Sequence, residues 1–125
     1  MALQVSECIS IHDLAVEAAA RMYAVEGYEV LIRHQPRPDL YGRMPFDLFV
    51  PELERVQEVE TLETLPGADL ARLLRCRENG LQVWMLVPLD AVAAAHASVK
   101  GAADHVIPFW ALEGERIRFG PPRRP

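Results

Sequence analysis

One apolar run limits the folds open to this chain more than any other feature of its sequence. Residues 81–88 read LQVWMLVP, almost without a polar interruption. A strand with one solvent-facing side would alternate polar and apolar residues, whereas a continuous apolar run of this length suits a strand covered on both faces. The rest of the chain must therefore supply apolar layers for both sides of a sheet.

The first covering element is predicted to be a helix over residues 11–26. Ser10, followed by Asp13 three residues later, is a helix-start pattern, and Gly27 suits the position just after a helix ends. Apolar residues recur at helical spacing between them, at Ile11, Leu14, Ala18, Met22 and Val25. A second helix is predicted between Pro66 and Gly80, and an alanine-rich third over residues 90–100.

Three short strands are predicted between the first two helices. Residues 28–34, 46–50 and 55–61 are rich in β-formers, and the prolines of residues 35–45 mark a loop. Because these strands are close in sequence, we expect an antiparallel meander. Further along, residues 105–112 and 116–119 are expected to form a hairpin, whereas the Pro/Arg tail 121–125 should join no regular element.

These elements predict an α/β fold with the order α-β-β-β-α-β, followed by a further helix and the hairpin. Such an order gives a mixed sheet with helices on its faces. A chain of 125 residues has room for one domain, which we place at residues 1–120, with the tail at 121–125.

Composition excludes several classes of protein. The two cysteines, Cys8 and Cys76, are too few for a disulfide framework or a four-cysteine zinc site. No apolar run approaches the ~20 residues that span a bilayer, and the start lacks the features of a signal peptide, so we expect a soluble cytoplasmic protein without membrane partners. The net charge of −5 means that any contact with nucleic acid must rely on a local basic patch.

Acidic residues interrupt two of the predicted strands. Glu58 and Glu60 lie two positions apart and share one face of the third strand, and Asp47 interrupts the second strand between Phe46 and Leu48. Adjacent strands are about 4.8 Å apart, so the three carboxylates can converge. Carboxylates in such a place must be solvated, paired or bound to a cation, and hard oxygen ligands suit Mg²⁺ or Mn²⁺.

This segment resembles the active-site hairpin of the PD-(D/E)xK phosphodiesterase superfamily. The family motif has an Asp opening the second core strand and a Glu-x-Lys on the third; Asp47 matches the Asp, and Glu58, eleven residues later, matches the Glu. The resemblance covers about two-thirds of the chain and implies a restriction-endonuclease-like αβββαβ core over residues 11–88. The chain is similar to small nucleases of the archaeal Holliday-junction-resolvase type. Glu60 stands where the family has its lysine, and Phe46 separates Pro45 from the motif Asp.

The resemblance implies a metal-dependent nuclease that hydrolyses phosphodiester bonds, with DNA a better candidate substrate than RNA. Asp47 and Glu58 would hold Mg²⁺ or Mn²⁺, with Glu17 of the preceding helix as a further ligand, and Glu60 would orient or deprotonate the attacking water. Arg43 or Arg55 would neutralise a substrate phosphate. A one-domain nuclease of this kind usually acts as a homodimer, and Phe109 and Trp110 are aromatic candidates for the self-association surface.

Other interpretations of the same residues stay open. Asp47, Glu58 and Glu60 could be solvated carboxylates paired with Arg43 or Arg55, and Glu17 could pair with Arg21 four residues later. The acidic net charge and the absent motif lysine favour a catalytically inactive relative that binds nucleic acid or a protein partner. The arginines at 72, 75 and 77 could form a nucleic-acid face, but Asp69 and Glu78 break up their charge and favour the solvated side of a helix.

Overall fold

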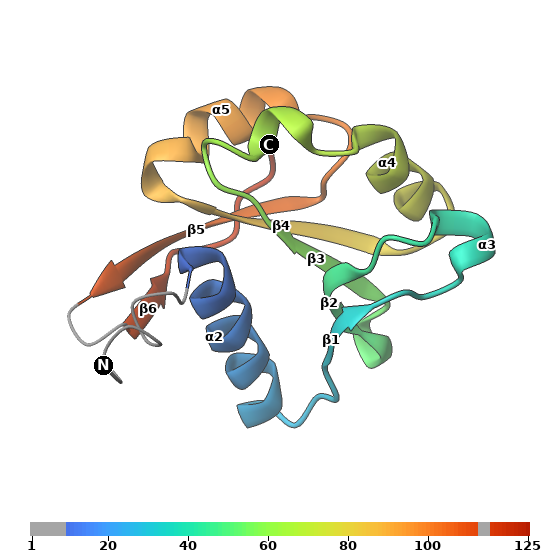
Figure 1. Cartoon of the computed structure of the whole chain (residues 1–125), viewed down its shortest axis with the longest axis horizontal. Helices are drawn as coiled ribbons and strands as arrows, with labels where there is room; N and C mark the ends of the chain where they lie inside the picture. The colour runs from blue at the N-terminus through green and yellow to red at the C-terminus, as the bar shows by residue number, and fades with distance from the viewer. Residues whose placement is uncertain (1–9, 113–115) are drawn as a thin grey trace, which may run out of the picture.

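The computed structural model describes residues 10–112 and 116–125, which form one six-stranded sheet with helices on both faces (Figure 1). The strands lie in the sheet in their order along the chain. Strands β1 to β3 form an antiparallel meander, β4 lies parallel to both β3 and β5, and β6 is antiparallel to β5. The bounds are β1 Leu31–His34, β2 Phe46–Val50, β3 Arg55–Val59, β4 Gln82–Pro88, β5 His105–Leu112 and β6 Arg116–Phe119. The expected α/β class and the antiparallel meander are confirmed.

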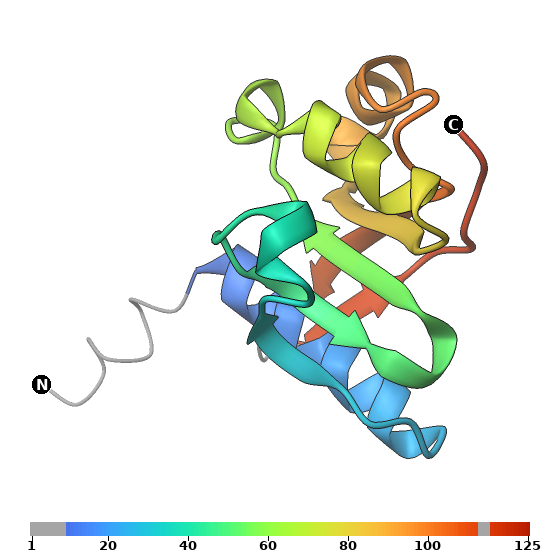
Figure 2. The same cartoon turned by 90° about the vertical axis from the view of Figure 1, so that its right-hand side faces the viewer.

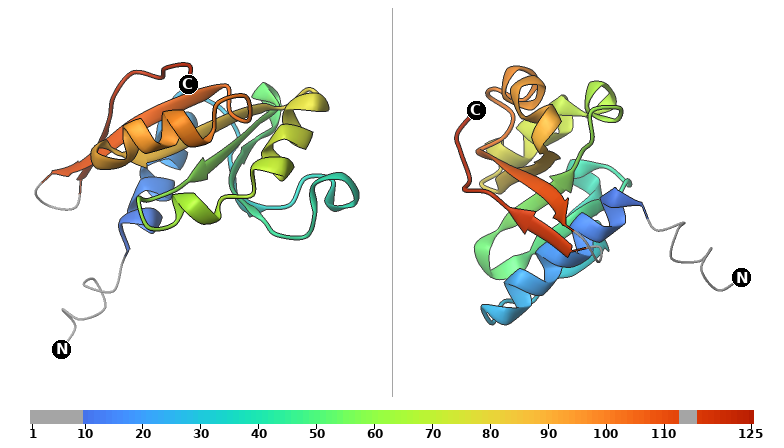
Figure 3. Two further views of the ribbon diagram at one scale, coloured as in Figure 1. Left: turned by 90° about the horizontal axis from the view of Figure 1, so that it is seen from above. Right: turned by 90° about the vertical axis from the view of Figure 1, so that its left-hand side faces the viewer.

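Two groups of helices cover the two faces of the sheet. Helix α2 (Ile11–Val25) lies on one face, and α4 (Leu70–Glu78) and α5 (Val92–Ser98) lie on the other (Figures 1 and 2). Figure 3 shows the sheet between these layers from two further sides. The short helix α3 (Pro38–Tyr41) and three 3-10 turns complete the regular elements of the described residues; the turns are η1 (Pro51–Leu53), η2 (Leu65–Gly67) and η3 (Leu89–Ala91). Within the described residues, no helix combines the length and the apolar character needed to cross a membrane.

Strand β4 is covered on both sides, as its apolar run predicts. Val83, Met85 and Val87 point into the core beneath α4 and α5, and Leu86 points into the core beneath α2. All four side chains are fully buried. The central position of β4, between two parallel neighbours, leaves no polar face for its side chains.

Helix α2 begins at the predicted residue and ends at Val25, one residue before the predicted bound. The Ser10 hydroxyl accepts a hydrogen bond from the Asp13 amide at 3.1 Å, which caps the first turn. Gly27 has a φ of 93°, a left-handed conformation that glycine adopts without steric cost. The small residues Ala15 and Ala19 face the sheet and are buried, so the helix axis lies close to the strands.

The structure differs from the predicted bounds in several places. Strand β1 begins at Leu31 rather than residue 28, because the Tyr28 amide still bonds to the Tyr23 carbonyl at the end of α2. Strand β3 ends at Val59 rather than residue 61, and α5 begins at Val92, after η3. The predicted loop 35–45 contains α3, which starts at Pro38, a residue suited to the first turn of a helix.

Two further predictions, on the C-terminal tail and on one aromatic residue, also differ from the structure. We predicted that residues 121–125 join no regular element, but Arg123 exchanges two backbone hydrogen bonds with Val106 of β5, at 2.8 and 3.0 Å. The tail therefore follows the stretch of β5 that β6 leaves uncovered. Phe109, a candidate for a self-association surface, is only 1% exposed and packs in the core beneath α2.

Candidate functional site

Strands β2 and β3 separate at the position of the two motif carboxylates. Their antiparallel pairing ends at Leu48 and Gln57, and Asp47 and Glu58 come next on the two strands. The Asp47 amide donates to Glu58 Oε1 at 2.7 Å, and the Val59 amide donates to Asp47 Oδ2 at 2.8 Å. Each carboxylate therefore replaces a backbone carbonyl as the hydrogen-bond acceptor of the opposite strand. We call this arrangement the β2–β3 fork.

Helix α2 brings a histidine to the fork. His12, in the first turn of α2, places Nε2 at 3.0 Å from Asp47 Oδ1 and Nδ1 at 3.1 Å from Asp13 Oδ1. The two Asp47 oxygens thus have different partners, the imidazole on one side and the Val59 amide on the other. Burial lowers the pKa of His12, but its hydrogen bonds and charge interactions with Asp13 and Asp47 outweigh burial and leave the pKa above 6.5.

Glu58 is a buried carboxyl group beside a second carboxylate. Burial raises its pKa, the neighbouring charge of Asp47 raises it further, and the result is a pKa of about 8. The hydrogen bond from the Asp47 amide and the charge of Arg72 act in the opposite direction and do not compensate. Glu58 therefore carries a proton at neutral pH when no cation is bound beside it.

Glu60 lies just beyond the end of β3. Its amide donates to the Leu86 carbonyl at 3.0 Å, which keeps the backbone beside β4 after the strand has ended. Burial raises the pKa of Glu60, and a hydrogen bond with Thr64 partly opposes that effect. A carboxyl group with a raised pKa is a better proton acceptor near neutral pH than an exposed glutamate.

The fork opens into a cleft of about 530 Å³. His12, Asp47, Glu58 and Glu60 line it, together with Thr64. Arginines line it as well: Arg43, in the connection between α3 and β2, and Arg75 of α4 are exposed, whereas Arg72 is only 8% exposed. The cleft thus places carboxylates and guanidinium groups around one hollow.

Arg72 is fixed by the connection that precedes β2. Its Nε donates to the Tyr41 carbonyl at 2.6 Å, and its Nη2 donates to the Met44 carbonyl. The guanidinium carbon lies 3.8 Å from the centre of the Phe46 ring, a cation–π arrangement. Arg72 therefore holds α4 to the segment that carries Arg43, in addition to placing a positive charge near Glu58.

The structure brings together some of the predicted site residues and not others. Asp47, Glu58, Glu60 and Arg43 all line the cleft. Glu17 does not: it lies five residues after His12, about 140° around the helix axis, and lines a separate exposed hollow with Arg33.

Arg55 also lies away from the cleft, on the α2 side of the sheet. Its Nη1 donates to the Tyr23 hydroxyl at 3.1 Å, and its guanidinium carbon is 3.6 Å from the centre of the Trp84 ring. Residues three apart on a strand face opposite sides, so Arg55 and Glu58 cannot share a face. The alternation of side chains along β3 could therefore have excluded Arg55 from the site on sequence alone.

Three functional residues of the cleft, His12, Arg72 and Arg75, were not assigned to it from sequence. His12 stands alone among scattered histidines, and only the packing of α2 against β2 brings it to Asp47. Arg72 reads as part of a solvated arginine face, although its neighbour Leu73 and the nearby Cys76 are buried on the same side of α4. The one local signal was Asp69, which caps α4 by accepting from the Arg72 amide at 3.0 Å.

The carboxylate oxygens of Asp47 and Glu58 are the kind of ligand that a hard divalent cation prefers, but most of them already have partners within the protein. Within residues 10–112 and 116–125, no group of three or more His, Cys, Asp or Glu side chains is arranged to hold a metal ion. Both Asp47 oxygens and one Glu58 oxygen accept hydrogen bonds or contact His12. A cation at Asp47 and Glu58 would have to displace the proton of Glu58 and turn at least one carboxylate.

Comparisons with protein-family models, with curated proteins and with solved structures gave no match, so the chemistry of the cleft is inferred from its own geometry.

Proposed function

We propose that this chain is a metal-dependent nuclease-like protein that hydrolyses phosphodiester bonds of nucleic acid, preferably DNA, in the cleft at the β2–β3 fork. The observation that carries the proposal is the fork itself. Two neighbouring strands part where each has an acidic residue, and the cleft at this point is also lined by arginines, whose guanidinium groups can hold a phosphate.

The arrangement of elements supports the proposal. The order α-β-β-β-α-β, with an antiparallel meander and a fourth strand parallel to the third, is the order that the resemblance to the PD-(D/E)xK superfamily implies. Asp47 on β2 and Glu58 on β3 occupy the motif positions and are neighbours across the fork. The short helix α3, inserted before β2, adds Tyr41 and Gly42 to the wall of the cleft.

Asp47 and Glu58 are the residues that would hold Mg²⁺ or Mn²⁺. When bound, such an ion polarises the phosphodiester and lowers the pKa of a coordinated water. His12 keeps Asp47 in position through the contact between Nε2 and Oδ1. Glu60 takes the proton of the attacking water, while Arg43 and Arg75 neutralise the phosphate.

A cleavage assay tests the proposal directly. Supercoiled plasmid, branched DNA and single-stranded DNA are incubated with the protein in Mg²⁺ and in Mn²⁺. We expect metal-dependent cutting that disappears in Asp47→Ala. Glu17→Gln is the matched control, because Glu17 is an acidic residue of the same fold outside the cleft, and it should cut like the unaltered protein. The absence of cutting on every substrate, together with no calorimetric Mn²⁺ binding, would overturn the proposal.

A second candidate function is a catalytically inactive module that binds nucleic acid or a protein partner. The hydrogen bonds at the fork favour it, because they give Asp47 and Glu58 a structural role without any metal. Glu60 replaces the motif lysine, and Lys100, the only lysine of the chain, lines a different hollow with Arg77 and Arg124. Such a module would bind a partner without binding Mn²⁺ at Asp47 and Glu58.

A further inference from the structure

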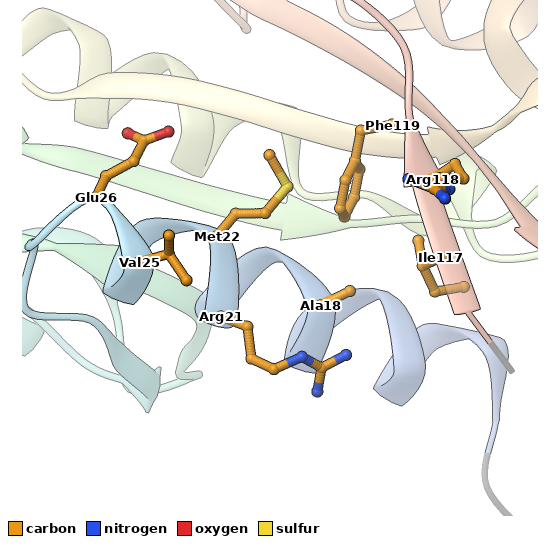
Figure 4. A pocket seen from close by; sticks show the side chains of 8 residues that line it. All are labelled: Ala18, Arg21, Met22, Val25, Glu26, Ile117, Arg118 and Phe119. Atoms are coloured by element: carbon orange, nitrogen blue, oxygen red, sulfur yellow. The ribbon is translucent and has the colours of Figure 1, made fainter.

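A second hollow lies between the end of α2 and strand β6, away from the β2–β3 fork (Figure 4). It has a volume of about 630 Å³. Its apolar floor consists of Met22 and Val25 from α2 and of Ile117 and Phe119 from β6. Glu26 lies at one end of it, and Arg21 of α2 and Arg118 of β6 lie towards the other end, as Figure 4 shows. We call it the α2–β6 groove.

The second half of α2 exposes an apolar face that the described part of the chain does not cover. Val25 is 87% exposed and Met22 is 49% exposed, whereas Ala15, Ala18 and Ala19 in the first half are buried. Ala18, Met22 and Val25 are spaced by four and three residues, so they lie along one stripe of the helix. A contiguous apolar stripe beside an apolar strand face is typical of an interaction surface.

A smaller hollow extends this surface towards the centre of the sheet. It has a volume of about 250 Å³ and shares Met22, Glu26 and Phe119 with the groove. Tyr23 and Trp84 add aromatic area at its far side. Stable protein interfaces bury about 800 Å² on each partner, so an interface here needs this extension as well as the groove itself.

The charges at the ends of the groove are complementary to each other. Glu26 and Arg118 make no ion pair with any residue that the structure describes. In a dimer with a two-fold axis, every contact occurs twice. If Glu26 of the first copy contacts Arg118 of the second, then Glu26 of the second contacts Arg118 of the first. A strip with apolar side chains, Glu26 at one end and the arginines Arg21 and Arg118 towards the other is therefore complementary to a second copy of itself, turned end to end.

We propose that a second copy of this chain occupies the α2–β6 groove and forms an isologous dimer. Met22 and Val25 of one copy pack on Ile117 and Phe119 of the other, and Glu26 of each copy pairs with Arg118 of its partner. This assigns self-association to α2 and β6 rather than to Phe109, which is buried. The proposal does not depend on nuclease activity, because none of the residues that line the β2–β3 cleft takes part.

Sedimentation equilibrium over a hundredfold range of protein concentration tests for the dimer. We expect the mass to rise from 14.0 kDa towards twice that value. Val25→Asp should raise the dissociation constant at least about tenfold, because it puts a charge into the apolar middle of the interface. Leu89→Asp is the control: Leu89 is also exposed, at 57%, but lies in η3. A protein that stays monomeric throughout, or dimers unaffected by Val25→Asp, would overturn the proposal.

An exchange of charges tests the two-fold pairing. Glu26→Arg and Arg118→Glu should each weaken the dimer, because each places like charges together, and the double variant should restore it by pairing the exchanged groups. Circular dichroism of each variant checks that the fold is unchanged. If the double variant is as weak as either single variant, Glu26 and Arg118 do not meet across a two-fold axis and the proposed interface is wrong.

Discussion

Glu58 combines burial with a neighbouring negative charge, and its protonation therefore enters the stability of the whole chain. A carboxyl group whose pKa is about 8 in the folded protein and 4.5 in the unfolded chain binds its proton more tightly when folded. Between these two pH values the folded state holds more protons, so the free energy of unfolding falls as the pH rises through this window. Below pH 4.5 Glu58 is protonated in both the folded and the unfolded state, so it does not lower the free energy of unfolding.

Glu58→Gln should therefore stabilise the protein at high pH and not at low pH. The glutamine side-chain oxygen can still accept the Asp47 amide, but it has no proton to lose. We expect a gain of about 4 kcal/mol in the free energy of unfolding at pH 8 and almost no gain at pH 4.5. Thermal unfolding followed by circular dichroism at both pH values measures it. Glu17→Gln, an exposed control, should change neither value, and equal gains at both pH values would refute the assignment.

At the scale of elements, the fork shows how two strands can part without leaving buried amides unsatisfied. Where the β2–β3 pairing ends, the Asp47 and Val59 amides bond to the carboxylates of Glu58 and Asp47. The same oxygens are the ones that would bind a cation. At the fork, the two carboxylates therefore have a structural role, as acceptors for backbone amides, and lie where they could also bind a cation. Substitutions can distinguish the structural role from the chemical one.

Asp47→Asn and Asp47→Ala should differ in stability but agree in activity. Asparagine keeps an oxygen for the Val59 amide, whereas alanine leaves that amide without its partner. We expect Asp47→Ala to be less stable than Asp47→Asn by about 1–2 kcal/mol in urea unfolding, with faster hydrogen exchange at the Val59 amide. Neither variant should cleave DNA. Equal stability of the two would show that the fork does not depend on this hydrogen bond.

Arg72 connects α4 to the segment before β2, and lysine cannot replace it. Its guanidinium group bonds to two backbone carbonyls and stacks on Phe46, whereas an ammonium group cannot make both bonds while stacking. We expect Arg72→Lys to lower the free energy of unfolding by about 2 kcal/mol in urea unfolding. Arg75→Lys, on the exposed side of the same helix, should change it by less than about 0.5 kcal/mol. Similar losses for both variants would mean that the buried bonds of Arg72 add no stability.

At the scale of the whole molecule, the sequence predicts what depends on local periodicity and misses what depends on distant neighbours. The apolar run of β4 predicted a covered strand, and Asp47 and Glu58 were placed on adjacent strands. The helix α2 was predicted, but of its apolar stripe only Ala18 is buried, and the buried face of the helix is completed by Ala15, Val16 and Ala19. His12 could not be assigned to the cleft, since 35 positions separate it from Asp47 along the chain. The pairing of Arg123 likewise depends on how much of β5 the strand β6 leaves open.

The distribution of charge over the molecule sets how nucleic acid can bind to it. The net charge is −5, and the exposed guanidinium groups at the cleft are those of Arg43 and Arg75. Each phosphate neutralised on duplex DNA contributes about −0.9 to the slope of log K against log salt concentration. Two such contacts give a slope of about −2, much shallower than that of a basic DNA-binding protein, so binding by one copy should be weak.

Fluorescence anisotropy of Asp47→Asn with labelled duplex DNA in Mg²⁺ measures this slope without cleavage. Adding Arg43→Gln should move the slope to about −1, because one phosphate contact is lost. Adding Arg33→Gln, in the separate hollow that holds Glu17, should leave it unchanged. A slope near zero would show that phosphates are not neutralised in the cleft and would favour the module that acts through a protein partner. A slope near −2 that responds to Arg43→Gln and not to Arg33→Gln would place the DNA backbone across the fork, within reach of Asp47, Glu58 and Glu60.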